Sequence, residues 1–181
     1  MKRALVAGIG NVLLGDDGIG PFIAQWLSEC YSFAEGVAVE DLGTPALDFI
    51  DHIAGLDVLI VVDSVENDLP PGTVTLYRKH ELMQNASFVR MDTHSPALTE
   101  SLVAAEVFFG VSPKEVLLIG VTGGSYAANC GLSGPVSHSV PRAVNAVLEE
   151  LTRLGVSYSR KNLRTSPSVA WKPIVAQSGN P

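Results

Sequence analysis

Val58-Leu59-Ile60-Val61-Val62-Asp63 is the stretch that decides the fold. Five apolar residues in succession, four of them β-branched, are typical of a strand that is covered on both faces in a largely parallel sheet. Two further runs, at residues 4–9 and 116–121, have the same character. The sequence therefore predicts at least three buried neighbouring strands.

Helical and extended patterns alternate around these runs. Four helices are predicted: one that begins in the Gly18–Pro21 region, one over 46–53, one from Ser95-Pro96 onward, and one over 137–154 that stops at Gly155. Further strands are predicted over 37–42 and over 73–77, the latter as an outer strand of the sheet. This alternation predicts an α/β fold, a three-layer α/β/α single domain around a largely parallel, twisted five-stranded sheet.

Charge separates the chain into a body and a tail. The 181 residues carry a formal net charge of −7, and residues 156–181 contain four cations and no acid, which leaves residues 1–155 with −11. An acidic body repels phosphate backbones, so no nucleic-acid partner is expected. We predict one domain over 1–155 and a basic, flexible tail over 156–181.

Composition points to a soluble protein of the cytoplasm. Hydrophobic residues make up 46% of the chain, yet no apolar run reaches the roughly 18 residues that a membrane span needs. The apolar stretch after Met1-Lys2-Arg3 is too short for a signal peptide. Cys30 and Cys130 lie far apart and suggest neither a disulfide scaffold nor a thiolate zinc site.

Residues able to bind a metal follow three predicted strand ends. Asp16 and Asp17 come after the first strand, Asp63 ends the third, and His94 precedes a helix start. In parallel sheets, ligands bind where strands end. A carboxylate that ends an apolar strand needs a partner or water, so Asp63 favours a functional role. Asp16 is interpreted as a helix cap.

A nucleotide site is the competing interpretation of the first loop, residues 8–20. Gly8-Ile9-Gly10 begins like a dinucleotide fingerprint, but Leu13 occupies the place of its third glycine. Asp16 and Asp17 stand where a phosphate-binding loop has Lys and Ser or Thr, which reverses the charge. Asp41, at the end of the second strand, keeps a ribose-binding alternative open.

The chain resembles the nickel-iron hydrogenase maturation endopeptidases from residue 3 to about 155. The motifs that carry the resemblance are Gly8-Ile9-Gly10-Asn11, Gly15-Asp16-Asp17-Gly18-Ile19-Gly20-Pro21, Leu59-Ile60-Val61-Val62-Asp63, Pro71-Gly72-Thr73, Thr93-His94-Ser95 and Gly131-Leu132-Ser133. Two departures, at Thr122-Gly123-Gly124 and at Gly134, concern which large subunit is recognised.

The resemblance implies that Asp17, Asp63 and His94 bind a divalent metal, nickel above all, and carry the reaction. It also implies removal of a C-terminal peptide from the precursor of a hydrogenase large subunit after nickel insertion. Two carboxylates and one imidazole leave coordination positions open, so the precursor could itself bring the nickel. A monomer is expected. A nickel-dependent scaffold that binds the precursor without cutting it uses the same residues.

Overall fold

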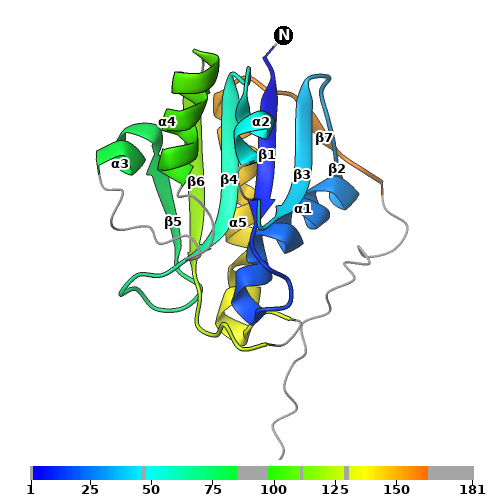
Figure 1. Cartoon of the computed structure of the whole chain (residues 1–181). Coiled ribbons are helices and arrows are strands. Elements are labelled where there is room, and N and C mark those ends of the chain that lie inside the picture. Colours follow the sequence, from blue (N-terminus) through cyan, green and yellow to red (C-terminus); the bar gives the residue numbers. More distant parts are fainter. Residues whose placement is uncertain (1, 46–47, 85–97, 111, 129–130, 163–181) are drawn as a thin grey trace, which may run out of the picture.

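The computed structural model describes residues 2–45, 48–84, 98–110, 112–128 and 131–162. Its centre is a five-stranded sheet of order β3-β1-β4-β6-β5 (Figure 1). The strands are β1 (Ala4–Ile9), β3 (Val37–Gly43), β4 (Val58–Val65), β5 (Val74–Arg78) and β6 (Glu115–Thr122). All neighbours pair in parallel except β5 with β6, which are antiparallel. The predicted fold class is confirmed.

Helices cover both faces of the sheet (Figure 1). One core packs α1 (Ile19–Cys30) and α5 (Gly134–Arg153) against alternate residues of the strands, such as Val6, Ile60 and Ile119. The other core packs α2 (Phe49–Ile53), α3 (Lys79–Gln84) and α4 (Leu98–Phe109) against the intervening strand residues. The apolar runs of the sequence are continuous because both faces are covered.

The first turn of α1 lies directly on the backbone of β1 and β4. A Cβ atom on Gly20 would come within 2.2 Å of the Ile9 carbonyl oxygen and 2.4 Å of the Val62 carbonyl oxygen. No side chain fits at such distances, so only glycine allows this approach. The glycines of the opening motif thus serve helix-to-sheet packing and hold the start of α1 at the carboxyl ends of two neighbouring strands.

Several predicted boundaries are corrected by the structure. Strand β4 continues two residues beyond Asp63, because Ser64 and Val65 still pair with β6. Helix α5 begins at Gly134 rather than at residue 137. Gly155 does end that helix, with φ of +72°, a conformation that glycine adopts without strain. The predicted helix start at Ser95-Pro96 lies outside the described residues.

A small second sheet was not predicted. Strands β2 (Tyr31–Phe33) and β7 (Tyr158–Arg160) pair antiparallel, and the rings of Tyr31, Phe33 and Tyr158 pack together. Residues 158–160, assigned from sequence to the tail, form strand β7 and pair with β2. Residues 163–181 lie outside the described residues, so a flexible tail there stays a prediction. No helix among the described residues has both the length and the apolar character needed to cross a bilayer.

Candidate functional site

The parallel strands β1, β3, β4 and β6 all end on one side of the sheet, which we call its carboxyl edge. The buried acids of the first loop and of β4 lie there. The chain leaves β1 toward β3 on one side, and β4 pairs with β1 on the other, so the strand order reverses between β1 and β4. Such a switch point is where open parallel sheets bind ligands. The 3-10 turn η1 (Gly15–Gly18), which follows β1, contacts β4 at this point.

Asp17 lies in that turn and is 8% exposed. Its Oδ2 atom accepts a 2.6 Å hydrogen bond from the backbone amide of Asn11. Gly10 makes this fold of the loop possible, because a Cβ there would lie 1.8 Å from the Asp17 carbonyl oxygen. The loop after β1 therefore wraps around Asp17 and holds its carboxylate at the strand edge.

Asp63 is 3% exposed and lies within β4, opposite Gly120 of β6. Its Oδ1 atom accepts a 2.7 Å hydrogen bond from the Ser64 amide. Alternation along the strand places Asp63 on the same face as Val61 and Val65, which pack toward α2 and α4. The structure thus brings Asp17 and Asp63 to the same edge, on neighbouring elements.

Asp16 is not a helix cap, which corrects the sequence-based interpretation. Its carboxylate accepts four hydrogen bonds from the connection between β6 and α5. The donors are the amides of Gly124, Ser125 and Ser133 and the hydroxyl of Ser133, at 2.6 to 2.9 Å. Asp16 is fully buried and structural. Because both oxygens of Asp16 already accept these bonds, Asp17 is the acid of the pair that is suited to binding a metal.

The third predicted ligand, His94, lies outside the described residues. Within the described part of the chain, no three His, Cys, Asp or Glu side chains are grouped as a metal site. The predicted convergence of Asp17, Asp63 and His94 therefore stays a prediction. The other histidines, His52, His80 and His138, are exposed, as expected from sequence.

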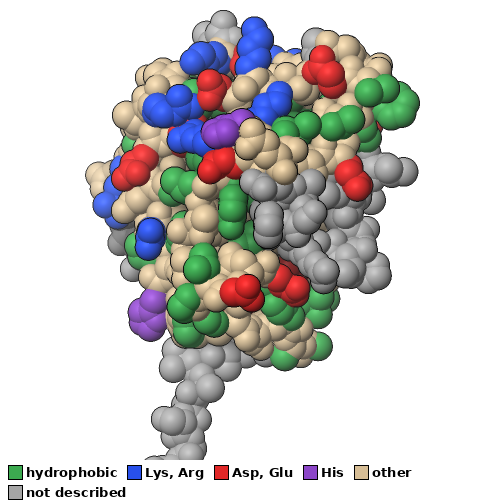
Figure 2. All heavy atoms as spheres, turned by 90° about the vertical axis from the view of Figure 1, so that its left-hand side faces the viewer, with side chains coloured by type: hydrophobic (Ala, Val, Ile, Leu, Met, Phe, Trp, Pro, Cys, Tyr) green, Lys and Arg blue, Asp and Glu red, His purple; other side chains and the backbone are tan. Residues whose placement is uncertain are grey.

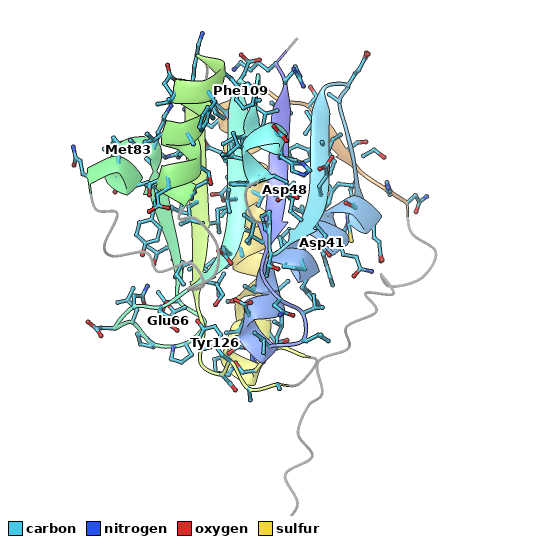
Figure 3. The ribbon with its side chains drawn as sticks, in the orientation of Figure 1. Asp41, Asp48, Glu66, Met83, Phe109 and Tyr126 are labelled. Carbon is cyan, nitrogen blue, oxygen red and sulfur yellow. The ribbon has the colours of Figure 1, made fainter. Side chains whose placement is uncertain are left out.

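Tyr126 is a member of this edge that the sequence did not single out. It follows Ser125 in the connection bound to Asp16, and its hydroxyl lies 2.8 Å from the Ser64 hydroxyl. Figure 3 shows Tyr126 and Glu66 together at the carboxyl edge, and Phe109 at the opposite end. Burial raises the pKa of Tyr126; the Ser64 hydrogen bond opposes this, and the charges of Glu66, Asp17 and Asp16 add to the rise. The phenol is therefore protonated at neutral pH.

A charged hollow at the amino edge of β6 is a structural feature rather than a second site. Figure 2 shows Lys and Arg side chains gathered in the upper part of this face. Arg78 and Arg153, which line the hollow, both bind the buried carboxylate of Glu150, and Arg153 also binds Glu115. Lys79 donates to the Ser112 hydroxyl and the Pro113 carbonyl. These cations join β5, β6 and α5.

The chain is similar to proteins of one known family. Residues 21–150 match the family model described as hydrogenase maturation protease. The chain is 36% identical to the hydrogenase expression/formation protein HoxM of Azotobacter vinelandii, over 84% of this chain and 73% of that protein. It is 33% identical to the hydrogenase 2 maturation protease of Escherichia coli, over 85% and 93% of the two chains.

Solved structures show the same fold. The hydrogenase maturating endopeptidase HybD from E. coli superposes with a TM-score of 0.81 at 31% identity, over 88% of this chain and 98% of that one. A hydrogenase 2 maturation peptidase from a Thaumarchaeota archaeon superposes with a TM-score of 0.61 at 36% identity, over 83% and 99%.

Proposed function

Because the chain belongs to the hydrogenase maturation protease family, whose members hydrolyse peptide bonds, we propose that it removes the C-terminal peptide of a nickel-loaded hydrogenase large-subunit precursor. The observation that carries the proposal is the placement of Asp17 and Asp63, two buried carboxylates, at the switch point between β1 and β4. His94 is proposed as the third residue of the site.

The described residues fit a divalent metal by the chemistry of their donors. Two carboxylates held in a buried site supply hard oxygen ligands, and an imidazole would add a nitrogen ligand that nickel and zinc accept. A bound metal would supply electrophilic activation of the peptide carbonyl or of a water molecule. The same open site could instead recognise nickel that the precursor carries.

The chain's own residues position these groups. The Asn11 amide fixes one oxygen of Asp17, and the Ser64 amide fixes one oxygen of Asp63. Asp16 holds the neighbouring connection in place through four hydrogen bonds. Both carboxylates are therefore preorganised, which lowers the reorganisation needed when a substrate or metal arrives.

Partner and location follow from the proposed reaction. We propose that the protein is a monomer and that it binds the precursor in the cytoplasm. The acidic body and the lack of an apolar run long enough for a membrane span support this proposal.

The test is incubation of the protein with a nickel-loaded precursor, followed by mass spectrometry of the product. We expect the precursor to lose its C-terminal peptide. An unchanged mass with the precursor still bound would instead support a scaffold that does not cut.

Single substitutions test the site residues in the same assay. D17N, D63N and H94A should each reduce cleavage at least a hundredfold, because each removes a proposed ligand. The matched control is D51N, which changes an exposed Asp on α2 and should leave cleavage unaltered. Wild-type rates in the site variants would show that the reaction does not use these groups.

A further inference from the structure

Tyr126 is held in a slot that the sequence provides for its ring. A Cβ atom on Gly123 would lie 2.4 Å from the Tyr126 hydroxyl oxygen and 2.6 Å from the adjoining ring carbon. Gly123 is therefore the residue that lets the hydroxyl end of the ring approach the backbone after β6. The Ser64 hydroxyl fixes the phenol oxygen through a 2.8 Å hydrogen bond.

The backbone that carries Tyr126 is fixed as well. The two residues before it, Gly124 and Ser125, donate their amides to Asp16, and the Ser125 carbonyl accepts from the Asp16 amide at 2.9 Å. The ring is thus anchored at its backbone and at its hydroxyl. Despite these anchors, Tyr126 is 38% exposed.

An anchored, partly exposed aromatic ring beside the turn that carries Asp17 is suited to binding a peptide. A Tyr side chain has two rotatable torsions, so fixing it against a ligand costs little entropy, and its amphipathic ring packs on apolar side chains and peptide planes. The Tyr126 hydroxyl is bonded to the residue that directly follows Asp63. The Ser64 side chain lies on the opposite face of β4 from Asp63. The connection that carries the ring is bound to Asp16, so a chain packed on the ring would run past the adjoining Asp17.

We propose that the exposed side of the Tyr126 ring binds the precursor's extended C-terminal segment next to the scissile bond and sets its position beside Asp17. The ligand is an extended peptide with an apolar side chain or a peptide plane against the ring. This inference rests on the proposed function and gives Tyr126 a role in substrate binding and specificity.

Steady-state kinetics on the nickel-loaded precursor test this role through KM and kcat separately. Y126A removes the ring, and G123A displaces it by filling the slot. Both should raise KM about tenfold and leave kcat within about twofold. Y126F keeps the ring and should stay within about twofold of wild type in KM. The control is D51N, which changes an exposed residue on α2 and should leave KM and kcat as in the wild type.

Two results would overturn the proposal: an unchanged KM in folded Y126A and G123A, or a fall in kcat at constant KM. If Y126A does not fold, Y126L, which keeps an apolar side chain in the slot, gives the same measurement. Failure of the proposed function can be distinguished from failure of the Tyr126 proposal. In the first case the wild-type protein would bind the precursor without cutting it. The Kd for the precursor would in that case replace KM and should show the same tenfold change.

Discussion

Asp16 and Ser133, 117 positions apart in the chain, are joined by two hydrogen bonds to the two oxygens of one buried carboxylate. The Ser133 amide donates to Oδ1 at 2.6 Å and its hydroxyl to Oδ2 at 2.9 Å. The start of α5 is therefore tied to the turn that presents Asp17. Stability and site geometry depend on the same carboxylate.

D16N should destabilise the protein by about 3 kcal/mol or more, because hydrogen bonds to a charged acceptor contribute about 1.5–3 kcal/mol each and are not additive. The N–H groups of the new side-chain amide would also face the backbone N–H groups that now donate to Asp16. Urea unfolding measures the loss. S133A removes one of the four bonds and should cost about 1.5 kcal/mol. Equal, small effects of both variants would contradict a central role for Asp16.

Close packing of α1 on the sheet gives a second prediction. G20A places a methyl group 2.2 and 2.4 Å from two backbone oxygens, which cannot move without shifting β1 or β4. We expect a loss of about 3 kcal/mol, at the upper end for overpacking. Thermal unfolding of G20A and of G134A, whose added methyl meets open space, should differ clearly. A G20A protein as stable as G134A would mean that α1 can move away from the strands.

The sequence predicted β1, β4 and β6 because their apolar runs are long and covered on both faces. The two outer strands, β3 and β5, are only partly buried and were predictable from shorter extended patterns. It did not predict β2 and β7, which have only three residues each. No turn residue marks the point where α1 ends at Cys30 and β2 begins at Tyr31. Ser133 and Pro135 signalled the true start of α5, yet the boundary was placed three residues later.

The site was predictable only where local sequence context indicates it. The strand context of Asp63 indicates function locally, and the structure confirms its burial. Asp16 was misassigned because its partners lie 108 to 117 positions away, beyond any local pattern. Tyr126 was missed because its significance depends on Gly123 and Ser64, which only the fold brings to it. The position of His94 stays a prediction.

Metal affinity provides a third prediction. The wild-type protein should bind one Ni²⁺ in a calorimetric titration, and D17N and D63N should each weaken binding at least tenfold because a neutral amide oxygen replaces a carboxylate. The exposed Asp51 again supplies the control, since D51N should bind as the wild type does. If all four proteins bind nickel only together with the precursor, the metal belongs to the substrate rather than to this chain.

The buried carboxylate of Glu150 gives a prediction of pH dependence. Burial alone would raise its pKa, but hydrogen bonds from Arg153 and Arg78, and their charges, lower it overall. A lowered pKa in the folded state means that protonation costs the folded protein more than the unfolded chain. The stabilising contribution of Glu150 is thus complete above about pH 4.3, the ordinary value for Glu, and is lost as the pH falls through the lowered folded-state pKa.

E150Q should therefore reduce stability by about 3 kcal/mol at pH 7, because it leaves Arg78 and Arg153 without the charge that they share. It should also flatten the decline of stability below about pH 4.3. Urea unfolding at a series of pH values, with the exposed neighbour variant E149Q as control, separates this effect from the loss of a surface charge. An acid decline in E150Q as steep as in the wild type would assign that decline to other carboxylates.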